Sequence, residues 1–425
     1  MFSLRTKINI ARALIRKDRP FYIQYYIGSA CNLVCRQCNI VEANSDLRNA
    51  DLATIEKIAK NLRKIGAGVI LLTGGEPFLR KDLPDIVRIL AAEGLNPRLQ
   101  TAGMTTTRAQ MEACAEAGAK DINISLDSLL PAKQEYINGS IPKSWHRAIE
   151  AIVNANDVFD DPDRICATGT VLSKLNYMEV PAIAEFATFM GWYSSVVPVH
   201  ITTPDNPMNF RGVADEMQFS LPDDEHLLSQ LEARMIAERR AGLNIFDSEA
   251  YIRSMFYFLR NNSPNWRKDG VCDSPSLYFA ILPNGDFAVC CDHRFQGRLS
   301  VADERFPEIY RSDEFRNAVM PTVTACSGCN YGSYPEVTLS VRDPRAIGER
   351  IKTVLFSKRA TVPKRTLAET YDFIDHLREK HRIPPYEGPD FQRKPMAFSQ
   401  RYGEPEGVQR GRKTAPAGSS PKQST

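Results

Sequence analysis

Several features that would place this 425-residue chain in a common class are missing from it. It has no uninterrupted apolar run of about 18 residues, so no membrane-spanning helix is predicted. Its net charge is only +3, which gives no general case for a nucleic-acid partner. Residues 1–19 mix Lys and Arg with Ile and Leu, but they lack a continuous apolar core and a small-residue cleavage site. They therefore make a poor secretory signal, and we expect a cytoplasmic protein.

The two ends of the chain also lack the pattern of a folded domain. The last 25 residues contain five basic residues and a single Val, and no Leu, Ile or Phe. Such a segment cannot bury a core, so we predict a disordered tail over residues 386–425. Residues 1–20 interleave basic and apolar side chains, which predicts an amphipathic helix before the first strand. A role for this helix at a membrane surface is the alternative.

Cysteine is present, and its grouping is informative. Eight of the ten cysteines fall within residues 31–38 and 272–329. Without a secretory signal a disulfide framework is not expected, and grouped cysteines favour a metal site. Cys114 and Cys166 stand alone, one in a helical pattern and one in a strand-like pattern. We predict that both are small buried hydrophobic residues.

Strand-like and helical patterns alternate from residue 21 to about residue 202. This spacing predicts βαβ units, which build a parallel sheet with right-handed crossovers. About six units are too few to close an eight-stranded barrel, so we predict an α/β fold with an open or partly closed barrel. The strand-like runs are 22–27, 68–73, 96–101, 121–126, 165–173 and 195–202, and the helical patterns lie near 51–65, 83–94, 107–117, 143–155 and 178–190.

The loop after the first strand carries Cys31, Cys35 and Cys38 with the spacing C-x3-C-x2-C. Three close thiolates can hold three irons of a cubane iron–sulfur cluster and leave the fourth iron without a protein ligand. An open coordination position is what a reactive metal centre needs. The alternatives are a zinc loop or a chance group of buried cysteines.

Polar or glycine-rich sequence follows the next three strands as well, at 73–77, 100–103 and 125–128. The carboxyl ends of parallel strands lie on one rim, so these segments should form one site. Gly74 and Gly75 have no Cβ, which lets a ligand approach their backbone closely. The Glu76 carboxylate could hold an amino group beside them. A simple Gly-Gly turn with a solvated Glu76 is the alternative.

In these residues the chain closely resembles the radical S-adenosylmethionine (radical SAM) superfamily. The two defining signatures of that family occur in order within residues 20–202: C-x3-C-x2-C after the first strand and Gly-Gly-Glu-Pro after the second. The resemblance implies a partial (βα)6 TIM-like barrel that binds a [4Fe-4S] cluster and S-adenosylmethionine (SAM). One electron, supplied by a reducing partner such as flavodoxin or ferredoxin, would cleave SAM. The resulting 5′-deoxyadenosyl radical would abstract hydrogen from a substrate.

The resemblance also implies a role for individual positions. The cluster ligands would be Cys31, Cys35 and Cys38. The methionine part of SAM would contact Gly74, Gly75 and Glu76. The amine, carboxylate or ribose of SAM would contact Gln100, Thr101 and Ser125, and its adenine would contact Val171. Two positions depart from the family pattern. Gln37 stands where an aromatic residue usually precedes the third cysteine. Asn138 stands where many relatives carry an arginine that pairs with the SAM carboxylate, and it would be the SAM contact at that position.

A second cysteine group begins at Cys272. The sequence between Cys272 and Cys290 contains two short strand-like runs around Asn284-Gly285, which predicts a β-hairpin that brings these cysteines together. Cys326 and Cys329 form a C-x2-C pair. The two pairs supply four ligands, and from spacing alone zinc and an iron–sulfur cluster compete for them.

The pattern C-x12-G-x4-C followed by C-x2-C resembles the twitch domain, a shortened relative of the SPASM domain that binds auxiliary clusters in radical SAM enzymes. The resemblance implies one auxiliary [4Fe-4S] cluster with Cys272, Cys290, Cys326 and Cys329 as ligands, and Cys291 is the alternative to Cys290. The expected units are an N-terminal amphipathic segment at 1–20, a radical SAM core at 21–202, a linker with helices at 203–265, a small α+β auxiliary-cluster domain at 266–335, C-terminal helices at 336–385 and the tail.

Two clusters would divide the chemistry between them. A cluster with four thiolates has no open site for a substrate and suits electron transfer. It could accept an electron from the substrate radical, which predicts a net oxidation by a dehydrogenase-like oxidoreductase. The proton released needs a base. The candidates are His200, at the end of the sixth strand, and Asp292, after the auxiliary cysteines.

The substrate is indicated only indirectly. The core begins near residue 20, which leaves no room for a preceding leader-peptide-binding domain, so we expect a small metabolite or natural-product intermediate. A peptide- or protein-modifying enzyme of the same superfamily is the first alternative. The second alternative is a non-catalytic iron–sulfur electron carrier. Gly74-Gly75-Glu76 argues against the carrier, which needs no SAM site.

Overall fold

The computed structural model describes residues 4–161, 164–200, 215–352 and 363–388. Its centre is one eight-stranded sheet with the order β6-β5-β4-β3-β2-β1-β7-β8. In this spatial order each strand from β6 through β1 to β7 is parallel to its neighbour, and the last pair, β7 and β8, is antiparallel. The strands are β1 (Tyr22–Gly28), β2 (Val69–Gly74), β3 (Asn96–Thr101), β4 (Asp121–Ser125), β5 (Cys166–Leu172), β6 (Tyr193–Pro198), β7 (Tyr278–Ile281) and β8 (Phe287–Ala288).

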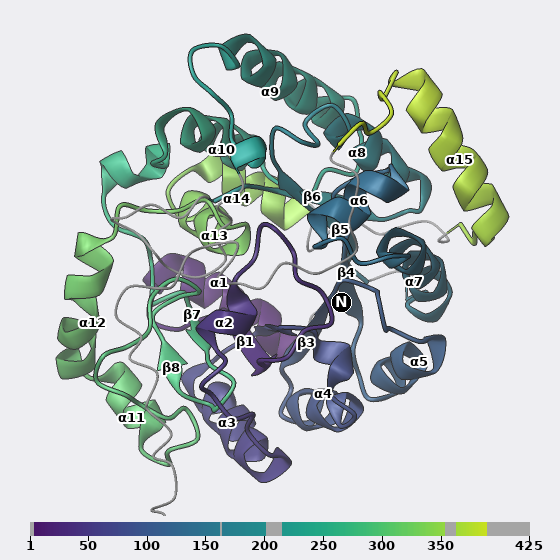
Figure 1. Cartoon of the computed structure of the whole chain (residues 1–425). Coiled ribbons are helices and arrows are strands. Elements are labelled where there is room, and N and C mark those ends of the chain that lie inside the picture. Colours follow the sequence, from purple (N-terminus) through teal and green to yellow (C-terminus); the bar gives the residue numbers. More distant parts are fainter. Residues whose placement is uncertain (1–3, 162–163, 201–214, 353–362, 389–425) are drawn as a thin grey trace, which may run out of the picture.

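The first six strands and the helices between them form the predicted βαβ units. Each strand from β2 to β6 pairs in parallel with the strand before it, and the connecting helices ring the strands on the outside (Figure 1). Residues 201–202 of the predicted sixth strand lie outside the described residues. The helices of the ring are α3 (Leu52–Ile65), α4 (Leu83–Ala92), α5 (Arg108–Glu116), α6 (Pro131–Ile137), α7 (Ser144–Val158) and α8 (Val180–Phe189).

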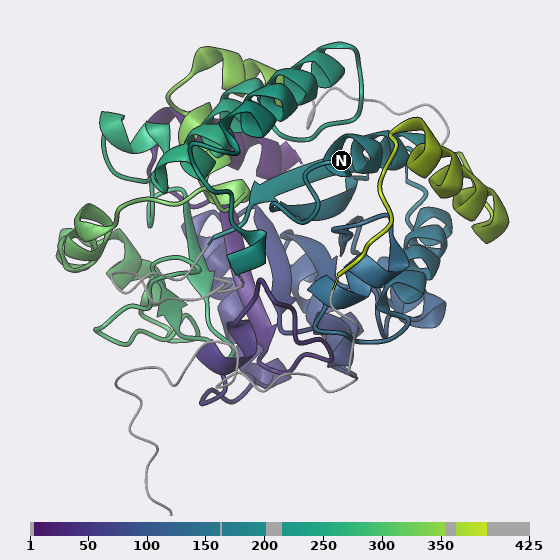
Figure 2. The ribbon, with the colours of Figure 1, turned by 45° about the horizontal axis from the view of Figure 1, so that its top comes forward.

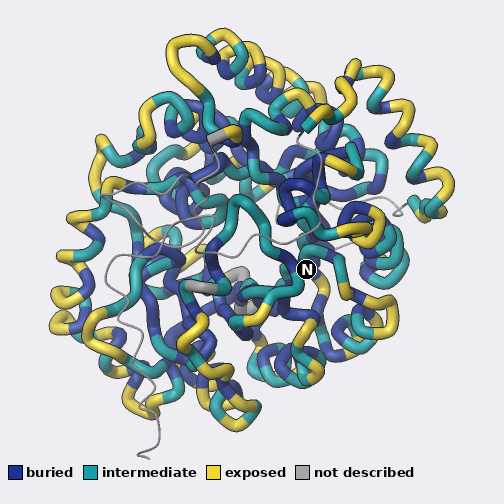
Figure 3. The backbone as a smooth tube through the Cα atoms, in the orientation of Figure 1, coloured by how far each residue is buried: buried dark blue, intermediate teal, exposed yellow. Residues whose placement is uncertain are grey.

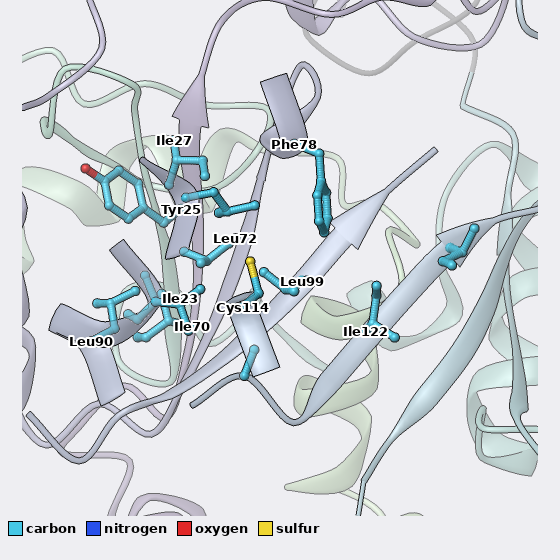
Figure 4. Close-up of a cluster of buried hydrophobic side chains, with 14 of the residues drawn as sticks. Ile23, Tyr25, Ile27, Ile70, Leu72, Phe78, Leu90, Leu99, Cys114 and Ile122 are labelled. Carbon is cyan, nitrogen blue, oxygen red and sulfur yellow. The ribbon is translucent and has the colours of Figure 1, made fainter. Parts of the chain in front are cut away.

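The outward face of the sheet is an apolar core. Ile23, Ile70 and Leu99 come from three neighbouring strands and are fully buried under the ring helices (Figure 4). Cys114 of α5 lies in the same cluster, and burial raises the pKa of its thiol to about 12. Cys166 is also fully buried. Both lone cysteines are therefore small buried hydrophobic residues, as predicted.

The inward face of the same strands is different. Successive strand residues point to opposite faces. Gln24, Gln100, Asn123 and Ser195 alternate with the buried core residues, and each keeps partial solvent exposure. The interior of a closed barrel is normally packed with branched apolar side chains. Here the interior of the curved sheet, which we call the lumen, is a cavity whose wall combines these polar side chains with apolar ones.

The predicted β-hairpin is present, and it joins the barrel sheet. β7 and β8 pair in antiparallel fashion across the Asn284-Gly285 turn, where Gly285 adopts a φ of +87°. β7 also pairs in parallel with β1, with Tyr22 opposite Tyr278. The sequence predicts a separate auxiliary-cluster unit for this hairpin, at 266–335. The hairpin instead continues the sheet, because the edge of β1 away from β2 offers unpaired backbone groups.

Further helices surround the hairpin and flank the ring. α9 packs on α10, and α15 packs on α7 and α8 at the edge of the molecule (Figures 1 and 2). Exposed residues concentrate on the outward sides of these helices, while the strands are mostly buried (Figure 3). The remaining elements are α1 (Leu4–Arg16), α2 (Ile40–Ala43), η1 (Pro77–Leu79), η2 (Asp215–Met217), α9 (Glu225–Arg240), α10 (Glu249–Asn261), η3 (Asn265–Asp269), α11 (Phe306–Arg311), α12 (Asp313–Ala325), α13 (Ser333–Ser340), α14 (Pro344–Ile351) and α15 (Leu367–Lys380).

Several predicted segments can be compared with these helices. The N-terminal amphipathic helix is present as α1, and α14 and α15 fall within the predicted C-terminal helices. Residues 203–214 of the predicted linker and residues 389–425 of the predicted tail lie outside the described residues. None of the described helices combines the length and hydropathy that crossing a bilayer requires.

Candidate functional site

The first cysteine group lies at the carboxyl ends of the barrel strands. Cys31, Cys35 and Cys38 line one cavity of about 420 Å³, together with Gly74 and Gly75. The loop that carries them follows β1 directly, so its position is set by the central strand of the sheet. Three thiols that line one cavity fit a three-thiolate cluster with one open iron.

The loop is held from its far side by the end of α6. The backbone N–H of Val34 donates to the carbonyl of Asn138 at 3.3 Å, and that of Arg36 donates to the carbonyl of Ile137 at 2.8 Å. The Asn138 side chain lies 3.7 Å from the Cys35 sulfur and donates to Ser144 Oγ at 3.0 Å. Asn138 lines the cavity, as its predicted SAM contact requires, and it also anchors the cysteine loop.

The two glycines allow close contact between two backbones. The N–H of Gly75 donates to the carbonyl of Gly28 at 2.9 Å, and the N–H of Glu76 donates to the carbonyl of Ala30 at 2.8 Å. A Cβ on Gly75 would lie 2.0 Å from the Ala30 carbonyl oxygen, and one on Gly74 would lie 2.3 Å from that of Gly28. The sequence indicated room for a ligand here. The structure adds that no side chain at either position is compatible with the start of the cysteine loop.

Glu76 is placed differently from the two glycines. Its side chain is buried, and it does not line the cavity. One carboxylate oxygen accepts from Thr101 Oγ1 at 2.8 Å and from the Phe78 N–H at 3.1 Å, and the other accepts from the Ala102 N–H at 2.9 Å. Burial raises the pKa of Glu76 above its usual value. The carboxylate thus ties the end of β2 to the end of β3, and its predicted contact with SAM stays a prediction.

The other predicted SAM contacts lie around the same cavity. Gln100, Thr101, Ser125 and Val171 all line it, and they come from β3, β4 and β5. Gln100 Nε2 donates to Ser125 Oγ at 3.4 Å, which links two neighbouring strand ends. The structure therefore brings together the strand-end residues that the resemblance selected. What each of them binds stays a prediction.

The sequence did not indicate what Gln37 contacts. Its Nε2 donates to Asp127 Oδ2 at 2.9 Å, and Asp127 Oδ1 accepts from the Val171 N–H at 2.7 Å. Burial raises the pKa of Asp127 to about 6. Both residues line the cavity. A polar pair therefore occupies the place of the aromatic residue that the family pattern predicts.

The second cysteine group lines another, smaller cavity. Its walls include Cys272, Cys290, Cys326 and Cys329. Cys291 is not among the lining residues, and its side chain is buried in the cluster that contains Tyr26 and Tyr334. This arrangement brings together the four cysteines that the twitch resemblance selected, and Cys291 interacts with Cys290 from the buried side without lining the cavity.

The surroundings of these four cysteines suit a cluster. Trp266 Nε1 donates to the Cys329 carbonyl at 3.2 Å, and Arg267 Nε donates to the Cys326 carbonyl at 3.0 Å. Burial raises the pKa of the Cys272 thiol to about 12. A thiolate there would therefore need a cationic partner such as iron. Among the described residues, no three or more His, Cys, Asp or Glu side chains converge closely enough for one metal ion. A cubane separates its thiolates more widely than a single ion does.

The two candidate bases lie in different places. His200 is 2% exposed and lines the larger cavity with the first cysteine group. Its Nδ1 is 2.8 Å from the Pro198 carbonyl, and its ring stacks on Tyr331. Asp292 lines the auxiliary cavity instead, and it is not among the lining residues of the larger one. Sequence spacing did not reveal Tyr331, which lines the larger cavity only two residues after Cys329.

Comparisons with known proteins identify a domain within this chain. Residues 25–187 match the family model described as "Radical SAM superfamily". The mouse (Mus musculus) "Molybdenum cofactor biosynthesis protein 1" is 34% identical over 173 residues, which cover 39% of this chain and 26% of that protein. A "GTP 3′,8-cyclase" of Chlorobaculum tepidum is 29% identical over 191 residues, which cover 41% of this chain and 53% of that protein. The chain thus matches about a quarter to about a half of the length of these relatives.

Two solved structures share the fold. Streptococcus suis SuiB, bound to S-adenosylmethionine, superposes with a TM-score of 0.55 at 18% identity and covers 74% of this chain and 71% of that one. The structure described as "Native anSMEcpe with bound AdoMet" superposes with a TM-score of 0.53 at 12% identity and covers 86% of this chain and 98% of that one. At such low identity these similarities concern the fold alone.

Proposed function

The chain carries a radical SAM domain over residues 25–187, and from this premise we propose that it is an enzyme that oxidises a small metabolite or natural-product intermediate. The observation that carries the proposal is the shared cavity of Cys31, Cys35, Cys38, Gly74 and Gly75. A [4Fe-4S] cluster and SAM held by these residues would supply the radical chemistry that removes a hydrogen atom from the substrate. A reducing partner such as flavodoxin or ferredoxin would provide the electron.

The chain's own residues would prepare this site. Asn138 and Ile137 orient the cysteine loop through their backbone carbonyls. Gly74 and Gly75 bring the end of β2 against that loop, and both line the cavity beside it. Gln100, Ser125 and Val171 would then contact SAM from the strand ends.

The second cysteine group supports the oxidative part of the proposal. Cys272, Cys290, Cys326 and Cys329 would hold one auxiliary [4Fe-4S] cluster with no open iron, which suits electron transfer. A substrate that gives a hydrogen atom to the radical, an electron to this cluster and a proton to a base loses two hydrogens in all. Tyr331 lines the SAM cavity and is two residues from Cys329 of the auxiliary cavity. One short segment of the chain therefore contributes to both cavities.

A cyclase is the second candidate, because the curated relatives named above include a GTP 3′,8-cyclase at 29% identity over 191 residues. Bond formation of that kind need not remove two hydrogens from the substrate. The peptide-modifying alternative has weaker support, since SuiB, which has also been solved bound to its precursor peptide SuiA, shares only the fold.

Anaerobic metabolite profiling tests the proposed reaction. The reconstituted enzyme, SAM and dithionite are incubated with a small-molecule extract, and the products are compared with those of an incubation without the protein. The proposal expects a substrate whose mass falls by two hydrogens while 5′-deoxyadenosine accumulates. A product that has the mass of its substrate, with SAM regenerated, would contradict the oxidation.

A further inference from the structure

The lumen beneath the SAM cavity is a second cavity, of about 280 Å³. The two cavities share wall residues, among them Gln37, Gln100 and Asp127. A ligand in the lumen would therefore lie directly next to SAM. Small-molecule sites are commonly cavities of this kind with a few polar groups placed to fix the ligand's orientation.

Four carboxamide side chains line the lumen. Gln24, Gln37, Gln100 and Asn123 come from β1, the cysteine loop, β3 and β4, and all four line it. Polar groups facing a barrel interior carry a free-energy cost unless water or a ligand hydrogen-bonds to them. A carboxamide both donates and accepts hydrogen bonds, so it suits a partner that does the same.

Two of these amides form a chain that leads toward the SAM cavity. Asn123 Nδ2 donates to Gln100 Oε1 at 2.9 Å, and Gln100 Nε2 donates to Ser125 Oγ at 3.4 Å. Space for the Asn123 side chain is made by Gly169 on the next strand, where a Cβ would lie 3.0 Å from the Asn123 oxygen. That oxygen is buried and has no hydrogen-bond partner among the described residues.

The lumen has two charged side chains among its described lining residues, Arg98 and Asp127. Arg98 is the one cationic side chain among the described lining residues, and its guanidinium is 3.5 Å from Asp121. A nucleoside triphosphate needs several cationic or metal contacts to hold its phosphates. The described walls therefore do not suit the triphosphate of a GTP-like substrate.

We propose that the lumen binds the substrate of this enzyme, and that this substrate is a small, uncharged, polyhydroxylated molecule such as a sugar or cyclitol. The inference rests on the proposed function, since it names the substrate class of the same site. A hydroxyl group both donates and accepts hydrogen bonds, which matches the carboxamides of Gln24 and Asn123 in the lumen wall. Asn123 is a substrate-binding residue in this arrangement, and Gln100 positions it.

The test compares two isosteric variants of the reconstituted holoenzyme. Asn123→Leu removes the carboxamide from the lumen. Thr168→Val is the matched control, because Thr168 is fully buried on β5 beside Gly169, on the face opposite the lumen. The Thr168 hydroxyl, like the Asn123 oxygen, has no hydrogen-bond partner among the described residues. Melting temperatures of both variants at or above that of the wild type show that they fold.

The probes are myo-inositol, methyl α-D-glucopyranoside and GTP. Calorimetric binding in the presence of SAM, and the rate of 5′-deoxyadenosine formation with and without each probe, are the two readouts. The proposal expects at least one of the two polyols to bind the wild type and Thr168→Val and to raise the rate several-fold. In Asn123→Leu the binding of the polyol should weaken at least tenfold. The rate of 5′-deoxyadenosine formation with the polyol should then be about equal to the rate without it.

Three results would overturn the proposal: no response to either polyol, a response of Asn123→Leu equal to that of the wild type, or tight binding of GTP alone. A wild-type enzyme that forms no 5′-deoxyadenosine with any probe would instead refute the proposed function. Calorimetric binding does not depend on turnover, so the binding assignment remains testable on the same preparation.

Discussion

The Nε2 atom of His200 accepts a hydrogen bond from the backbone N–H of Asn330 at 3.1 Å. Because Nε2 accepts, the ring proton is on Nδ1, which donates to the Pro198 carbonyl at 2.8 Å. The imidazole therefore joins the end of β6 to the segment just after Cys329, and both of its nitrogens are engaged. His200 is better placed to position the auxiliary site than to act as the base that its sequence position indicated.

Replacing His200 tests this role. His200→Phe keeps the stacking on Tyr331 but leaves the Asn330 N–H without its acceptor, which should lower the free energy of unfolding by about 1–3 kcal/mol. We also expect loss of the auxiliary cluster, about four of roughly eight irons per chain. His200→Gln restores an acceptor near Nε2 and should keep the iron. If His200→Phe binds as much iron as the wild type, His200 does not position the auxiliary site. If His200→Gln binds as much iron as the wild type but is inactive, His200 has a role beyond positioning.

The auxiliary ligand set is tested by a pair of adjacent cysteines. Cys290 lines the cavity with Cys272, Cys326 and Cys329, whereas Cys291 is not among the lining residues, although its side chain interacts with that of Cys290. Cys290→Ala should therefore lose one cluster, about four irons per chain, and its characteristic low-temperature electron paramagnetic resonance signal. Cys291→Ala is the matched control and should keep both. The opposite result would make Cys291 the ligand.

The glycines at the end of β2 make a prediction about stability. A Cβ on Gly75 would lie 2.0 Å from the Ala30 carbonyl oxygen, so Gly75→Ala must displace backbone and should destabilise the protein by about 1–3 kcal/mol or more. Gly348→Ala in α14 is the control. Nothing lies within 4 Å of its Cβ position, and alanine should stabilise that helix by about 0.5–1 kcal/mol. Urea denaturation under anaerobic conditions measures both, and equal stabilities would contradict the packing described here.

The buried carboxyl group of Asp127 predicts a pH dependence of stability. Its folded-state pKa, about 6, is above the ordinary value of 3.8, so the folded protein binds this proton more tightly than the unfolded chain. The stabilisation from this group is fully present below about pH 4 and is lost as the pH rises through about 6. In Asp127→Asn this loss is absent. The free energy of unfolding of the wild type, relative to the variant, should therefore fall by roughly 1–3 kcal/mol between pH 4 and 7. If the free energies of unfolding of the wild type and of Asp127→Asn change in parallel with pH, the pKa of Asp127 lies near its ordinary value and the prediction is wrong.

Much of the barrel could be predicted from local sequence. Strand and helix positions follow from short-range periodicity, so β1 to β5 fall close to the predicted runs. The grouping of Cys31, Cys35 and Cys38 with Gly74 and Gly75 follows from one rule, that the carboxyl ends of parallel strands share a rim.

The parts that could not be predicted depend on partners far apart in the chain. Gln37 and Asp127 are 90 residues apart, and neither residue alone indicates that their side chains hydrogen-bond. The burial of the Glu76 carboxylate against Thr101 and Ala102 depends on how β2 and β3 pack. The pairing of β7 with β1 depends on which strand edge is left open once the barrel strands have paired.

The most direct test of the account is whether the first cysteine group supports SAM cleavage. Reconstituted wild-type protein, Cys35→Ala and Cys291→Ala are incubated anaerobically with SAM and dithionite, and 5′-deoxyadenosine is measured by liquid chromatography and mass spectrometry. The account predicts 5′-deoxyadenosine from the wild type and from Cys291→Ala, and at least a hundredfold less from Cys35→Ala, because the cluster would lose one of its three protein ligands. Wild-type protein that holds its iron but forms no 5′-deoxyadenosine, or an equally active Cys35→Ala, would contradict it.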